Sequence, residues 1–202
     1  IGYDNVFDYS LGNPSVPCPS SFTKAMIDMY ETADPVALHG YSPSLGNPEA
    51  CRTIAESLNR RFGMDYTAGH IFPTTGAAGA LAHALRAVTK PGDEVLTFAP
   101  YFPEYHPYVE GAGARLTVVP ADIESFQINF AAFEAALNPE VAVVLINTPN
   151  NPSGAVYSAE TLDRLAGILR AKQAEYGHDI FLISDEPYRE IVFDGGTQPY
   201  PA

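Results

Sequence analysis

The sequence predicts a three-layer α/β/α fold in which helices cover both faces of a mostly parallel sheet. Two observations support this fold class. Short apolar runs typical of strands alternate along the chain with longer segments whose apolar residues recur at helical spacing. The run at 141–146 is apolar throughout, as expected for a strand that helices bury on both faces. Alternation of this kind favours parallel strand pairing.

The N-terminal segment has a different composition from the rest of the chain. Its first 48 residues carry many Pro and Gly residues around one helical stretch at 21–32, which is typical of an arm and a strapping segment. We therefore expect residues 1–45 to lie outside the main domain and residues 46–202 to form it. The main domain opens with a helix at 48–62, where apolar residues recur at steps of four.

The remaining elements of the main domain follow in alternation. Apolar runs between turn residues predict strands at 70–72, 94–98, 115–119, 141–146 and 180–183. Helical residues and periodicity predict helices at 77–88, 101–111, 129–137 and 159–176. Ser158 is a good N-cap for the last helix, because its side chain can accept a hydrogen bond from the first turn.

Composition and charge exclude several classes of function. The 202 residues are 46% apolar and contain 11 Lys and Arg against 24 Asp and Glu, which gives a net charge of −13. This charge would repel a phosphate backbone, so it argues against nucleic-acid binding and favours small molecules or proteins as partners. No apolar run reaches the roughly 20 residues that a membrane helix needs, and the N-terminus shows no export signal. We expect a soluble, cytoplasmic protein with no membrane association.

Metal binding is not indicated either. The two cysteines, Cys18 and Cys51, have no CxxC spacing, and the five histidines show no HExxH-type pattern. We expect two reduced, structural thiols and no metal site.

Polar and aromatic residues follow several of the predicted strands. In chain order they are Phe102, Asn151, Asp185 and Tyr188. Because ligands gather at the carboxyl ends of parallel strands, we expect these side chains to share one site. A largely buried Asp185 carboxylate needs a partner, and a protonated pyridine nitrogen is one. Each residue alone also has a structural explanation: core packing for Phe102, a turn for Asn151 and a cap for Asp185.

The turn at 75–79, between a predicted strand and a helix, is a second candidate binding segment. Its backbone N–H groups and the positive end of the helix could hold a phosphate around Gly76. A tight turn with small residues for close packing is the structural alternative. A dinucleotide-binding loop is excluded, because Leu81 or Ala82 stands where its third glycine would be.

Together these segments resemble the pyridoxal-phosphate-dependent aminotransferases of fold type I, classes I and II. The resemblance rests on Asn-x-Pro-Asn-Asn-Pro-Ser-Gly at 147–154 with Asp-x-x-Tyr at 185–188. The Pro-Gly-Asp-Glu-Val-Leu run at 91–96, followed by Pro-Tyr at 100–101, strengthens it. It implies the large domain of that fold, incomplete at its C-terminus and preceded by an arm and part of the small domain.

The resemblance also implies a site for pyridoxal 5'-phosphate. The residues that would contact this cofactor are Tyr41, Gly76, Ala77, Ala78, Phe102, Asn151, Asp185 and Tyr188. Backbone amides of Ala77 and Ala78, after Gly76, would hold the phosphate; Ala78 stands where many relatives place Ser or Thr. Tyr41 resembles the tyrosine that reaches a phosphate in the neighbouring subunit, which implies a homodimer.

The other implied contacts surround the cofactor ring and the substrate. Phe102 matches the aromatic residue that stacks on the ring, and Asp185 matches the partner of its pyridinium nitrogen. Asn151 and Tyr188 match the amide and the phenol that meet the 3-hydroxyl. Gly12 is similar to the glycine that approaches the substrate carboxylate, and Asn151 would also adjoin the substrate.

The catalytic lysine of the family has no counterpart in this chain. Transamination requires a Schiff-base lysine, which family members carry some tens of residues after Asp-x-x-Tyr. The chain has Lys24, Lys90 and Lys172, all before Asp185, and it lacks the C-terminal arginine that binds the substrate carboxylate. We therefore expect no catalytic residue in this chain, which by itself would be inactive. A fragment of a longer enzyme or a piece of a split one is favoured over a degenerate relative, because the cofactor residues are present.

The whole enzyme is expected to move an amino group from an amino acid to a 2-oxo acid, with its remaining C-terminal part as a partner of this chain. A C–S lyase or synthase of the same fold is one alternative. A non-catalytic, aminotransferase-like ligand-sensing domain is another.

Overall fold

The computed structural model describes residues 5–6, 12, 16–193 and 195–200. The chain divides into two compact units, Ile1–Asn47 and Pro48–Ala202. Most of the predicted arm before residue 16 lies outside the described residues. The assignment of residues 1–45 to an arm and part of a small domain, and of 46–202 to a cofactor-binding domain, stays a prediction.

The N-terminal unit contains two helices among its described residues. Helix α1 (Ser20–Thr32) confirms the helix predicted there, and the shorter α2 (Pro35–His39) was not predicted. Asp34 is the N-cap of α2: its side chain accepts hydrogen bonds of 2.8 and 2.9 Å from two backbone amides of the first turn. Cys18 in this unit is a free, exposed thiol.

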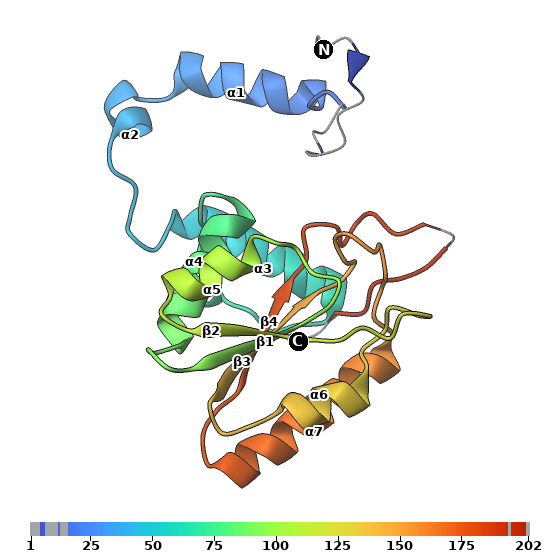
Figure 1. The fold of residues 1–202 in the computed structure, drawn as a ribbon. Helices are drawn as coiled ribbons and strands as arrows, with labels where there is room; N and C mark the ends of the chain where they lie inside the picture. The colour runs from blue at the N-terminus through green and yellow to red at the C-terminus, as the bar shows by residue number, and fades with distance from the viewer. Residues whose placement is uncertain (1–4, 7–11, 13–15, 194, 201–202) are drawn as a thin grey trace. The chain divides into compact units, whose positions relative to one another are not determined.

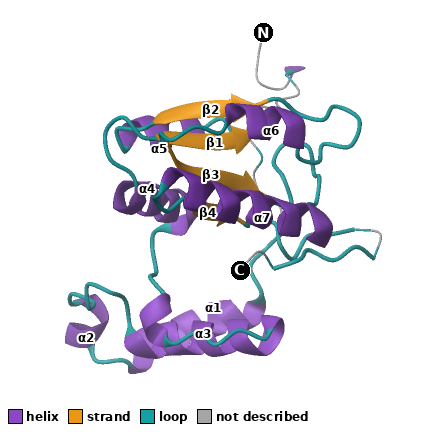
Figure 2. Cartoon of the chain, turned by 90° about the horizontal axis from the view of Figure 1, so that it is seen from below, coloured by secondary structure: helices purple, strands orange, loops and turns teal. Residues whose placement is uncertain are grey.

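The C-terminal unit is built on a parallel sheet of four strands in the order β2-β1-β3-β4. Their bounds are β1 (Glu94–Phe98), β2 (Arg115–Val119), β3 (Val141–Asn147) and β4 (Phe181–Asp185). Figure 2 shows this order from top to bottom of the view. All four strands were predicted, but β3 and β4 continue beyond their expected ends to include Asn147 and Asp185.

Helices cover both faces of this sheet. The helices of the unit are α3 (Pro48–Phe62), α4 (Gly76–Val88), α5 (Tyr105–Gly111), α6 (Phe130–Ala136) and α7 (Ala159–Tyr176). Helices α4 and α5 lie on one side and α6 and α7 on the other (Figure 1). Val143 and Val144, neighbours in β3, therefore point into different cores, the first shared with Leu85 and the second with Leu165. This arrangement confirms the predicted three-layer α/β/α fold.

One predicted element is wrong and another is wrong in part. Residues 70–72 form no strand: His70 ends a 3-10 turn, η2 (Ala68–His70), and Phe72 is exposed. His70 is held in this turn because its Nδ1 accepts a hydrogen bond of 2.9 Å from the backbone amide of Thr67. The helix predicted from residue 101 begins only at Tyr105, because Pro103 disfavours helical geometry at Phe102. Among the described residues, no helix is both long and apolar enough to cross a membrane.

The strand order places a binding crevice at a defined position. The chain passes from β1 to β2 on one side and then returns to β3 on the other side of β1. In open α/β sheets, ligands bind outside the carboxyl ends of the strands where the order reverses in this way. That position lies beyond the ends of β1 and β3.

Candidate functional site

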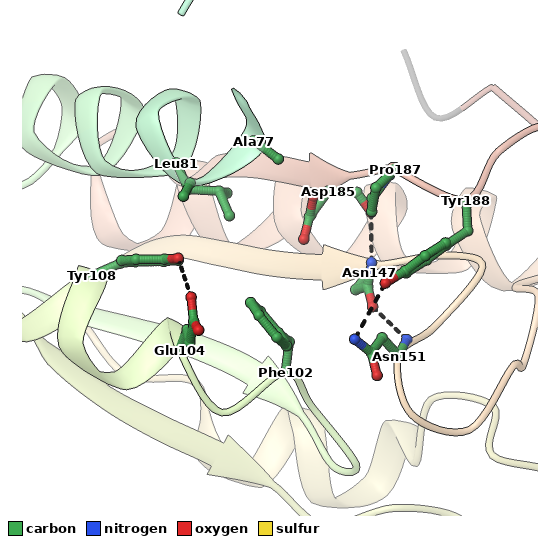
Figure 3. Close-up of a pocket in the computed structure, with 11 residues that line it drawn as sticks. Ala77, Leu81, Phe102, Glu104, Tyr108, Asn147, Asn151, Asp185, Pro187 and Tyr188 are labelled. Atoms are coloured by element: carbon green, nitrogen blue, oxygen red, sulfur yellow. Dashed lines mark hydrogen bonds between the residues drawn. The ribbon is translucent and has the colours of Figure 1, made fainter. Parts of the chain in front are cut away.

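A cavity of about 250 Å³ lies at this switch point. Its walls come from the carboxyl ends of β3 and β4, the start of α4 and the segment between β1 and α5 (Figure 3). The lining residues are Ala77, Ala78, Leu81, Phe102, Glu104, Tyr108, Asn147, Asn151, Asp185, Pro187 and Tyr188. Six residues predicted from the sequence, at positions 77, 78, 102, 151, 185 and 188, are thus brought together.

Asp185, the last residue of β4, supplies a carboxylate to the cavity. Its Oδ2 accepts a hydrogen bond of 2.6 Å from the hydroxyl of Tyr105, which is the first residue of α5 and is fully buried. Burial raises the pKa of the Asp185 carboxyl; the Tyr105 hydrogen bond opposes this effect, and Glu186 adds to it. Burial and contact with Asp185 also raise the pKa of Tyr105, so its hydroxyl remains a donor. The site therefore contains a partly desolvated acid that a cationic ligand atom would stabilise as the anion.

Replacing Asp185 with asparagine is expected to stabilise the cofactor-free protein at neutral pH. Folding raises the pKa of the Asp185 carboxyl. Its protonated form therefore contributes fully to the free energy of unfolding only below the pKa of the unfolded chain. This contribution is lost as pH rises through the pKa of the folded protein. Asparagine does not titrate but still accepts the Tyr105 hydrogen bond. Urea unfolding should therefore show the variant more stable at about pH 7.5, with a smaller difference near pH 4.5.

The exposed Asp163 on α7 provides the matched control for this measurement. Asp163→Asn should give no comparable gain in the free energy of unfolding, because that carboxylate is already solvated. An Asp185→Asn protein no more stable than the wild type at neutral pH would contradict the expectation.

A second wall of the cavity carries an amide and a phenol. The side-chain Nδ2 of Asn151 donates to the Tyr188 hydroxyl at 3.4 Å, and both side chains border the cavity beside Asp185 (Figure 3). The Asn151 loop is held by Asn150, whose Oδ1 accepts from the amide of Ser153 at 3.0 Å. The peptide bonds before Pro149 and Pro152 are both cis. The amide and the phenol can together contact a hydroxyl group on a flat ligand.

The start of α4 forms a third side of the site. Gly76 begins the helix with a φ of 75°, a left-handed conformation that glycine adopts without strain. The side chain of Thr75 at the N-cap position accepts no hydrogen bond from the first turn. Ala77 and Ala78 line the cavity, and amides in the first turn of a helix have no intrahelical acceptor. These amides and the helix dipole suit an anionic group.

Phe102 supplies the aromatic surface of the site. Its ring lies 5.8 Å from that of Tyr105 in an edge-to-face arrangement, which fixes it against the core while it still lines the cavity. Nearby, the hydroxyl of Tyr108 donates to Glu104 at 2.5 Å, and this bond raises the pKa of Tyr108 to about 12. A flat ligand can stack on Phe102 while its edge faces Asp185.

Several residues of this site were not predicted from the sequence. They are Leu81, Glu104, Tyr105, Tyr108, Asn147 and Pro187. Asn147 could have been recognised as a site residue from the sequence, because it is the polar residue that ends a fully apolar strand. Tyr105 could not have been assigned to the site from the sequence, because its contact with Asp185, eighty residues later, depends on tertiary packing.

Two predicted residues remain, at positions 12 and 41. Gly12 and Tyr41 belong to the N-terminal unit, where both are exposed. Their contacts with a substrate and with a neighbouring subunit stay predictions. The lining residues of the cavity include no lysine.

A family model for aminotransferases of class I and II matches residues 4–201. Among the relatives, a probable aspartate/prephenate aminotransferase of Thermus aquaticus is 34% identical over 77% of this chain and 39% of its own length. A probable N-succinyldiaminopimelate aminotransferase of Mycobacterium tuberculosis is 34% identical over 84% of this chain and 42% of its own.

Solved structures give the same result. An amino transferase from Eubacterium rectale has a TM-score of 0.95 and 48% identity, over 98% of this chain and 50% of that one. Aspartate aminotransferase from Thermus thermophilus, solved with maleate, has a TM-score of 0.84 and 30% identity, over 95% of this chain and 47% of that one. The chain thus spans about half the length of these relatives. It belongs to the aminotransferase class I and II family.

Proposed function

We propose that the complete gene product is an aminotransferase that moves an amino group from an amino acid to a 2-oxo acid, and that this chain holds its cofactor. The family depends on pyridoxal 5'-phosphate. One observation carries the proposal: the Asp185 carboxylate faces a cavity bordered by an amide, a phenol, an aromatic ring and a helix N-terminus. These groups fit the nitrogen, hydroxyl, ring and phosphate of that cofactor.

Each residue then has a definite task. Asp185 would keep a proton on the ring nitrogen of the cofactor, which when bound would supply an electron-withdrawing ring for reaction at the substrate alpha carbon. Asn151 and Tyr188 would contact the 3-hydroxyl of the ring. Phe102 would stack on the ring and exclude water from it.

The phosphate and the substrate are assigned to other parts of the chain. The amides of Ala77 and Ala78, after Gly76, bind the phosphate at the start of α4. Tyr41 reaches the phosphate of a neighbouring subunit, so the enzyme is proposed to be a homodimer, located in the cytoplasm. Gly12, with Asn151, approaches the substrate carboxylate. The lysine that carries the cofactor is proposed to come from residues outside these 202.

Product analysis of the complete gene product tests this function. The protein is incubated with pyridoxal 5'-phosphate, an amino donor and a 2-oxo acid; aspartate is a suitable first donor, since relatives are named for it. We expect one new amino acid for each 2-oxo acid formed from the donor. Release of ammonia with pyruvate from a sulfur-containing amino acid, without a new amino acid, would instead establish the lyase alternative.

A further inference from the structure

Asn147 links two of the residues that border the cavity. It is the last residue of β3, only 4% exposed, and pairs in register with Asp185 of β4. Its Nδ2 donates a hydrogen bond of 2.8 Å to the backbone carbonyl of Asp185. Its Oδ1 accepts one of 2.6 Å from the backbone amide of Asn151. Figure 3 shows both bonds leaving the same side chain.

This side chain spans the point where the backbone ladder ends. The pairing of β3 with β4 stops at Asn147 and Asp185, and the chain then turns away into separate loops. The nitrogen and the oxygen of the planar Asn147 amide each bond to one of these two segments, after β4 and after β3. A change in the orientation of this amide would therefore move Asp185 and Asn151 relative to each other.

Asn59 also makes two side-chain hydrogen bonds to backbone, but both are to a single residue. In α3, its Nδ2 donates to the carbonyl of Tyr66 at 2.9 Å, and its Oδ1 accepts from the amide of the same residue at 2.7 Å. Both bonds go to one residue, and Asn59 does not line the cavity. Asn147 instead connects two segments, each of which presents a polar side chain to the cavity.

We infer that Asn147 is a positioning residue, which sets the distance and orientation of the Asp185 carboxylate relative to the Asn151 amide. The inference rests on the proposed function, because those two groups are assigned to the nitrogen and the 3-hydroxyl of one rigid ring. A ring with fixed substituents binds well only when both protein groups are correctly placed. Asn147 acts through its neighbours and needs no contact with the reacting atoms.

The test is a double-mutant cycle on cofactor affinity in the complete gene product. The dissociation constant for pyridoxal 5'-phosphate is measured by equilibrium titration of the cofactor-free wild type, Asn147→Ala, Asn151→Ala and the double variant. We expect Asn147→Ala to weaken binding about 10- to 100-fold. The loss of affinity caused by Asn147→Ala should be smaller when residue 151 is already alanine, because Asn147 acts in part by positioning the Asn151 side chain. An equal factor in both backgrounds would overturn the inference.

Asn59→Ala is the matched control, since it also removes two side-chain hydrogen bonds to backbone. It should leave the dissociation constant within about twofold of the wild type. An equal loss of affinity in Asn59→Ala and Asn147→Ala would show a general effect of stability and would reject the positioning role. If Asn147→Ala does not fold, Asn147→Ser replaces it, because a serine hydroxyl is too short to reach both partners.

Failure of the inference and failure of the proposed function are distinguishable. A folded wild-type protein that does not bind the cofactor would remove the proposed function. A wild type that binds it, with an Asn147 variant of unchanged affinity, would remove only the positioning role.

Discussion

Asp185→Ala in the complete gene product should lower the rate of the half-reaction with an amino acid by about 10²- to 10⁴-fold. Removing one partner of a buried ion pair costs roughly 3–5 kcal/mol, and each 1.36 kcal/mol corresponds to a factor of ten in rate. Without the carboxylate, the ring nitrogen of the cofactor would lose its proton and the ring would withdraw electrons less strongly. The measurement is a single-turnover experiment that follows the absorbance of the bound cofactor after mixing with the amino donor.

The fold should survive this substitution. Asp185 ends β4, and its backbone carbonyl can still accept the hydrogen bond from Asn147. Circular dichroism should match the wild type, and Asp163→Ala, which removes an exposed carboxylate from α7, should leave the rate unchanged. Near-normal rates in Asp185→Ala would refute the assignment of this residue to the cofactor nitrogen.

The polypeptide of residues 1–202 alone should form no specific covalent bond to the cofactor and should show no turnover. None of its three lysines is among the residues that line the cavity. Lys24 pairs with Asp28 within α1, and Lys172 pairs with Glu175 on the surface of α7. Lys90 lies in the turn before β1, at the amino end of the sheet, whereas the cavity lies at the carboxyl end.

Borohydride reduction followed by intact mass measures this outcome. The polypeptide is mixed with about one equivalent of pyridoxal 5'-phosphate, reduced and mapped by peptide mass. We expect no lysine to be labelled stoichiometrically, whereas the complete gene product under the same conditions should gain one cofactor mass. Stoichiometric labelling of Lys24, Lys90 or Lys172 would contradict the expectation.

Local sequence patterns predicted a helix or a strand correctly where the structure of the segment depends mainly on its own residues. The apolar run of β3 and the periodicity of α7 predicted both elements because burial on a strand or a helix face depends on spacing along the chain. Ser158 was expected to cap α7, and its side chain accepts the hydrogen bond from the amide of Thr161. The strand predicted at 70–72 does not form, because His70 is held in a 3-10 turn by the hydrogen bond from the amide of Thr67.

The cavity depends both on residue types that the sequence shows and on contacts that only the tertiary structure shows. The sequence by itself determined the fold class and the chemical groups at the strand ends, Phe102, Asn151, Asp185 and Tyr188, because these follow from residue type and position after each strand. Only the tertiary structure decided how they are held. The hydroxyl of Tyr105 reaches Asp185 across the core, and Asn147 ties Asp185 to Asn151. Such contacts depend on strand order and register, which bring together residues that no local pattern relates.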